Sequence, residues 1–142
     1  KTHRRILVLG LANTGKTTNV LRALQSFQKS YAPCYFSTKA SSIQFALSVF
    51  PTLTIQTTLN ASSPKTEIQQ VLLIDDLDCL DTNDLEIISD LLHTQTAWSK
   101  IILLSRALVK SHDIMPHIDA VVKLKEKTAE LIFSSLTILK AD

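Results

Sequence analysis

The chain of 142 residues has few cysteines and no long apolar run. Because no stretch of 18 consecutive apolar residues occurs, we expect no membrane-spanning helix and no membrane partner. The two cysteines, Cys34 and Cys79, fit neither a Cys-x-x-Cys metal site nor a disulfide framework. We interpret both as reduced, buried thiols. That interpretation favours a reducing compartment and predicts a cytoplasmic, intracellular protein.

A strong net charge is also absent, because the formal net charge is only +2. The lysines and arginines of the first half are scattered along the sequence rather than clustered, so we do not expect this domain by itself to bind nucleic acid. The length suits one domain with a core of its own. We expect residues 1–142 to be a single domain excised from a longer chain.

Glycine is also scarce, since the chain contains only two, and both lie in one octapeptide. Gly10–Thr17 reads G-x-x-x-x-G-K-T, with the apolar run Ile6–Leu9 before it and a helical pattern after it. Such a strand–loop–helix segment is typical of a phosphate-binding loop, because glycine permits the backbone to curl and the loop amides then point inward. The expected nucleotide-binding residues are Gly10, Leu11, Ala12, Asn13, Thr14, Gly15, Lys16, Thr17 and Thr18.

Two side chains of this loop have expected roles of their own. Lys16 is expected to contact the β- and γ-phosphates, and Thr17 to offer its hydroxyl to Mg²⁺. A second motif supplies the opposing group, because the apolar run Val71–Ile74 is followed directly by Asp75 and Asp76. A buried strand would deliver Asp75 at its carboxyl end, where it can hold Mg²⁺ through water. Asp76 can then orient or deprotonate the attacking water.

A third segment, Lys100–Arg106, is an apolar strand that ends in Ser-Arg. Arg106 is a candidate sensor of the γ-phosphate, because a guanidinium binds phosphate oxygens through several donors. The nearby acids are interpreted as a solvated acidic edge; they are Asp78, Asp81 and Asp84. Trp98 and the tyrosines are interpreted as packing residues, and the histidines show no metal-ligand spacing.

Strands and helices alternate along the chain, which predicts an α/β fold: a three-layer α-β-α sandwich with a mainly parallel, five-stranded sheet. The alternating stretch Leu53–Leu59 predicts a half-exposed strand near the edge of the sheet. We expect helices from Lys16, from Ser41 or Ser42 to Pro51, from Asp81 or Thr82, and from Thr128 to Leu139. The apolar runs expected as strands are Arg4–Leu9, Cys34–Ser37, Val71–Ile74, Ile101–Leu104 and Ala120–Leu124.

These motifs together resemble a P-loop NTPase of the ASCE type, with Walker A and Walker B motifs, and more narrowly the nucleotide-binding domain of STAND ATPases of the NB-ARC/NACHT type. The resemblance covers Gly10–Thr18, Leu72–Asp76, Lys100–Arg106 and Val121–Phe133. It implies binding of ATP or ADP with Mg²⁺, and a nucleotide-dependent switch with slow ATP hydrolysis. Lys16, Asp76 and Arg106 would be its catalytic residues, and Thr17 and Asp75 its metal ligands. The implied partners are other domains of the same chain and a nucleotide-dependent oligomer.

Two alternatives stay open at this point. One is the core of a motor ATPase, either AAA+ or of the FtsK/HerA-like group that translocates or packages DNA, whose late segment the stretch from Met115 to Val122 also resembles. Asp76 and Arg106 favour the switch over this motor. The other is a nucleotide-binding module with little hydrolysis.

Overall fold

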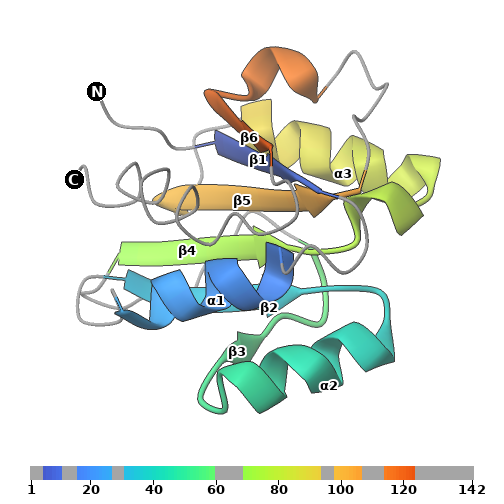
Figure 1. The fold of residues 1–142 in the computed structure, drawn as a ribbon. Coiled ribbons are helices and arrows are strands. Elements are labelled where there is room, and N and C mark those ends of the chain that lie inside the picture. The colour runs from blue at the N-terminus through green and yellow to red at the C-terminus, as the bar shows by residue number, and fades with distance from the viewer. Residues whose placement is uncertain are drawn as a thin grey trace.

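In the part of the chain that the structure describes, six strands form one sheet, and every pairing in it is parallel (Figure 1). The computed structural model describes residues 5–10, 16–26, 31–59, 69–93, 98–106 and 114–123. The strand order is β3-β2-β4-β5-β1-β6. The strands are β1 (Arg5–Leu9), β2 (Tyr31–Phe36), β3 (Thr54–Ile55), β4 (Gln69–Ile74), β5 (Lys100–Ser105) and β6 (Ala120–Lys123).

The expectation of a five-stranded sheet is therefore wrong by one strand. The stretch Leu53–Leu59 does supply a strand at the edge, but only Thr54 and Ile55 of it pair, with Cys34 and Tyr35 of β2. β2 in turn begins earlier than the predicted Cys34 and includes Pro33. Pro33 is tolerated because β3 covers only the next two residues, so Pro33 does not lie between two paired strands.

Helices cover both faces of the sheet, which confirms an α/β sandwich (Figure 1). The two helices α1 (Lys16–Ser26) and α2 (Ala40–Val49) pack on one face, and α3 (Thr82–His93) packs on the other. Two short 3₁₀ turns, η1 (Leu77–Cys79) and η2 (Met115–His117), adjoin α3's side. Side chains alternate between the faces along each strand, so β4 sends Val71 and Leu73 to one core and Leu72 and Ile74 to the other.

The helix boundaries follow local chemistry. Asp81 caps α3, because its Oδ1 accepts the backbone N–H of Asp84 at 2.8 Å. The predicted serine cap of α2 is wrong, since the helix already begins at Ala40 and Lys39 occupies the cap position without a side-chain hydrogen bond. Pro51 follows the end of this helix as expected. The helix expected from Thr128 lies outside the described residues.

All strands being parallel, their carboxyl ends meet at one edge of the sheet. Within the sheet, β2, which follows β1 in sequence, lies on one side of β1, whereas β6 pairs with β1 on its other side. A reversal of this kind opens a crevice beside the carboxyl ends, where open α/β sheets bind ligands. Among the described residues, no helix is both long and apolar enough to cross a membrane.

The two free cysteines differ in exposure, so the expectation of two buried thiols is wrong for Cys79. Cys34 lies within β2 and is 2% exposed, whereas Cys79 ends η1 at the surface. Burial also raises the pKa of the Cys34 thiol, which lowers its reactive thiolate fraction.

We expect iodoacetamide near neutral pH to modify one thiol of the folded chain and two thiols in denaturant, counted by intact-mass spectrometry. Cys79→Ser should leave the folded chain unmodified, whereas Cys34→Ser should not change the native count. Two rapid modifications of the folded chain would contradict the burial of Cys34.

Candidate functional site

Thr17 and Asp75 meet at the carboxyl edge of the sheet although 58 positions separate them. Thr17 lies in the first turn of α1, and Asp75 directly follows β4. The Thr17 hydroxyl donates a hydrogen bond to Asp75 Oδ2 over 2.9 Å. The hydroxyl oxygen keeps its lone pairs for another partner, because its proton is the one shared with the carboxylate.

The Asp75 carboxylate is buried, with only 4% of the residue exposed. Three donors hold it: the hydroxyls of Thr17 and Tyr35 on Oδ2, and the backbone N–H of Asp76 on Oδ1. Burial raises the pKa of Asp75 above its ordinary value, although the hydrogen bonds from Tyr35, Thr17 and Asp76 counteract that rise. Burial and the adjacent Asp75 charge also raise the pKa of Tyr35, which keeps that hydroxyl protonated and therefore a donor.

Asp76 takes a left-handed backbone conformation, with φ 55° and ψ 42°. Aspartate tolerates this conformation better than most residues, because its short side chain bonds locally. Here Asp76 Oδ2 accepts the Ser37 hydroxyl over 2.6 Å, and Ser37 Oγ in turn accepts the Lys39 backbone N–H over 3.1 Å. The turn and this short chain of hydrogen bonds direct the second carboxylate toward the end of β2.

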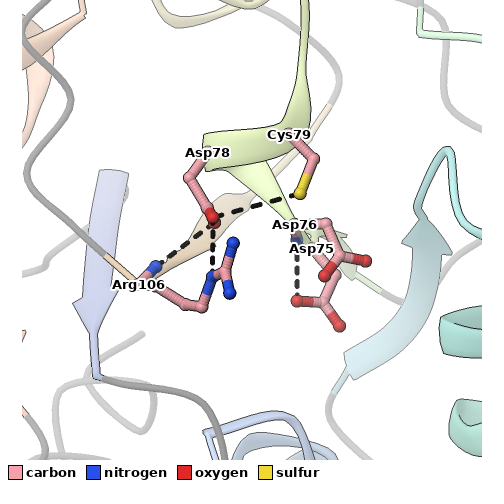
Figure 2. A network of polar contacts seen from close by, with 5 residues as sticks. All are labelled: Asp75, Asp76, Asp78, Cys79 and Arg106. Carbon is pink, nitrogen blue, oxygen red and sulfur yellow. Dashed lines mark hydrogen bonds and ion pairs between the residues drawn. The ribbon is translucent and has the colours of Figure 1, made fainter.

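Arg106 directly follows β5 and forms an ion pair with Asp78, the middle residue of η1. Its Nε donates to Asp78 Oδ2 over 2.8 Å, and its backbone N–H donates to Oδ1 over 3.3 Å. Burial alone would raise the pKa of Asp78, but the hydrogen bonds and charge of Arg106 outweigh burial and hold that pKa below its usual value. In Figure 2 the Arg106 and Asp78 side chains point toward each other, and Asp75 and Asp76 lie beside the guanidinium.

These groups line one pocket of about 270 Å³. One wall comes from Thr17 and the two acids after β4, and another from the ion pair of Arg106 with Asp78. The first turns of α2 close a third side. The lining residues are Thr17, Lys39, Ser41, Ser42, Phe45, Asp75, Asp76, Asp78, Leu104 and Arg106.

The structure thus brings together four of the residues singled out from the sequence: Thr17, Asp75, Asp76 and Arg106. Gly10 lies at the end of β1, and its N–H donates to the Ser105 carbonyl over 3.1 Å. Lys16 begins α1 and Thr18 lies in its first turn. Leu11, Ala12, Asn13, Thr14 and Gly15, like the side chain of Lys16, lie outside the described residues.

Sequence reasoning missed three residues of the site. Tyr35 and Ser37 were assigned to packing and to a strand end, yet each donates to one of the two acids. Asp78 was assigned to a solvated acidic edge, but it pairs with Arg106 and lines the pocket. A usable signal existed for the first two, because hydroxyls at the end of β2 lie two residues apart and so share one face of the sheet.

The pocket offers oxygen donors that suit a hard divalent cation. Mg²⁺ keeps several waters and takes only one or two protein oxygens, and Thr17 Oγ1 beside the Asp75 carboxylate fits that requirement. Within the described part of the chain, no three His, Cys, Asp or Glu side chains gather as a metal cluster. These two oxygens therefore suit a cation that keeps most of its water ligands.

No protein-family model matches the chain, and no curated protein matches it in sequence. An assignment of function consequently depends on the site geometry and on the motifs.

We expect Asp75 and Asp78 to titrate on opposite sides of the ordinary aspartate pKa, followed by ¹³C NMR of the carboxyl carbons. Because the pKa of Asp75 is higher in the folded state than in the unfolded state, Asp75 contributes fully to the free energy of unfolding at a pH below its unfolded-state pKa. That contribution is lost as the pH rises through its folded-state pKa. The lowered pKa of Asp78 works the other way: its contribution is present above the unfolded pKa and is lost as the pH falls through the folded value.

Thr17→Val is the matched variant for this titration, since it removes one hydroxyl donor at nearly constant volume. It should raise the Asp75 midpoint further and leave the Asp78 midpoint in place. Coincident midpoints for the two aspartates in the unchanged chain would contradict the assigned environments.

Proposed function

We propose that this chain is a P-loop nucleotide-binding domain that binds ATP or ADP with Mg²⁺, hydrolyses ATP slowly, and acts as a switch in a larger protein of the STAND type. The observation that carries the proposal is the hydrogen bond between Thr17 and Asp75. It joins the lysine–threonine end of the glycine motif to the first acid of the second motif, as a shared magnesium site requires.

The strand order supports the same proposal. The resemblance expects the Lys100–Arg106 strand beside the strand of Asp75, and β5 pairs with β4 along four residues. β5 also pairs with β1, so the strand that Arg106 directly follows lies between the two motif strands. The ends of the three strands therefore face the same crevice.

Each side chain then has a separate task. Thr17 and Asp75 would hold the cation, which neutralises charge on the phosphate oxygens when bound. Asp76 would accept a proton from, or orient, the attacking water, and the Ser37 hydroxyl on Oδ2 leaves Oδ1 for that task. Lys16 would bind the β- and γ-phosphates.

Arg106 would sense the γ-phosphate. Only its Nε bonds Asp78 among the guanidinium nitrogens, so the terminal nitrogens can donate to a phosphate while the pair persists. Asp78 thus holds the arginine at the mouth of the pocket, where 53% of its side chain is exposed. The ion pair with Asp78 connects Arg106, the proposed sensor, to η1, which begins directly after Asp76, the proposed base.

Nucleotide binding is tested by calorimetry with ADP and with a non-hydrolysable ATP analogue, each with and without Mg²⁺. We expect Lys16→Ala to weaken binding on the order of 10- to 100-fold, because it removes a charged donor to phosphate. Lys123→Ala, at the end of β6, removes an exposed lysine outside the pocket and should bind like the unchanged chain. Equal affinities for Lys16→Ala and the unchanged chain would refute the proposed site.

ATP turnover tests the role of Asp76, and the preference between the ATP analogue and ADP tests the role of Arg106. Asp76→Asn should lower ATP turnover by about 100-fold or more while nucleotide affinity persists, because it removes a proton acceptor and little else. Arg106→Ala should erase any preference for the ATP analogue over ADP. Unchanged turnover or unchanged preference would remove the respective role. Stimulation of turnover by double-stranded DNA would favour the motor alternative.

A further inference from the structure

Tyr35 is a buried side chain whose hydroxyl reaches the site from a strand that carries none of the expected motifs. The residue is wholly buried on the face of the sheet that α1 and α2 cover. Its ring packs in the apolar core, a task that phenylalanine would perform equally well. The hydroxyl, however, donates to Asp75 Oδ2 over 2.5 Å.

The hydrogen bond from Tyr35 limits which lone pairs of the Asp75 carboxylate stay available to a ligand. Each carboxylate oxygen accepts about two hydrogen bonds. The hydroxyls of Thr17 and Tyr35 fill Oδ2, and the backbone N–H of Asp76 takes one position on Oδ1. Among the contacts of the described residues, one lone pair of Oδ1 and those of the Thr17 hydroxyl are left for a ligand.

A second acceptor lies near the same hydroxyl. The Ser42 carbonyl of α2 is 3.5 Å from the Tyr35 oxygen, a full ångström farther than Asp75 Oδ2. A hydroxyl has one proton, so the shorter contact holds it. Ser42 also lines the pocket, which means that Tyr35 stands between the acid and the helix turn on the opposite wall.

From this arrangement we propose that Tyr35 is a positioning residue for the divalent cation: its hydroxyl fixes the orientation of Asp75 so that Oδ1 and the Thr17 oxygen face the cation's water shell together. The proposal rests on the function proposed above and adds a residue outside its motifs. Without the hydroxyl, the Asp75 carboxylate keeps only Thr17 on Oδ2 and can rotate away from the shared orientation. Residues that orient metal ligands typically matter 10- to 100-fold for metal affinity.

The test is Tyr35→Phe in the complete chain, with Mn²⁺ as the probe followed by electron paramagnetic resonance in the presence of ADP. We expect Mn²⁺ affinity to fall roughly 10- to 100-fold, while ADP affinity in the presence of EDTA stays unchanged. Tyr31→Phe is the matched control, because Tyr31 lies at the opposite end of the same strand and pairs in register with Gln69. It should leave both affinities unchanged.

The outcomes separate the two proposals. If the unchanged chain binds ADP and Mn²⁺ but Tyr35→Phe binds both equally well, the positioning role is overturned and the nucleotide site survives. The role is also overturned if the variant loses ADP and Mn²⁺ affinity in parallel, since a residue that only positions the metal ligand leaves metal-free ADP affinity unchanged. If the unchanged chain binds no nucleotide, the proposed function fails and the role of Tyr35 fails with it.

A second measurement applies even if Tyr35→Phe does not fold. The chain contains two tyrosines, so fluorotyrosine incorporation gives two ¹⁹F signals, which Tyr31→Phe assigns. We expect the Tyr35 signal to shift when Mg²⁺ is added to the ADP-loaded chain and the Tyr31 signal to stay in place. A Tyr35 signal that does not respond to Mg²⁺ would overturn the proposal.

Discussion

The buried Asp75 carboxylate is the constraint on which the rest of the site depends. A carboxylate that is 4% exposed requires hydrogen-bond donors, since an unpaired buried charge is strongly unfavourable. Its donors come from α1, from β2 and from the next backbone amide of the chain. Satisfying this one group therefore fixes the start of α1 against the ends of two strands.

The parallel sheet makes that convergence possible. Because all strands run the same way, Ser37, Asp75 and Arg106 each follow a strand and emerge at the same edge. The left-handed turn at Asp76 then bends the chain into η1, which returns Asp78 to Arg106. Two acids that are adjacent in sequence thereby acquire different partners: hydroxyls and an amide hold Asp75, whereas Ser37 holds Asp76. Different surroundings are what allow neighbouring carboxylates to serve different tasks.

Much of the fold could be predicted because apolar periodicity reports burial directly. The run Val71–Ile74 predicted a strand, which is β4, and the helix expected from Asp81 or Thr82 is α3. The failures have physical causes as well. The strand expected from Cys34 begins earlier, because Pro33 is accommodated where β3 is too short to need its missing N–H. Leu53–Leu59 alternated like a long strand, but β2 offers a pairing edge to only two of its residues.

The sequence by itself determined the chemistry of the motifs: two glycines in one octapeptide, a threonine after its lysine, and two acids after an apolar run. These are local features, so spacing along the chain suffices to find them. Only the tertiary structure decided which distant groups complete them, namely Tyr35 on Asp75, Ser37 on Asp76 and Asp78 on Arg106. The sequence around a hydroxyl or an acid does not indicate which distant group it will contact. The order and register of the strands determine that partner, and both arise because the whole sheet is buried together.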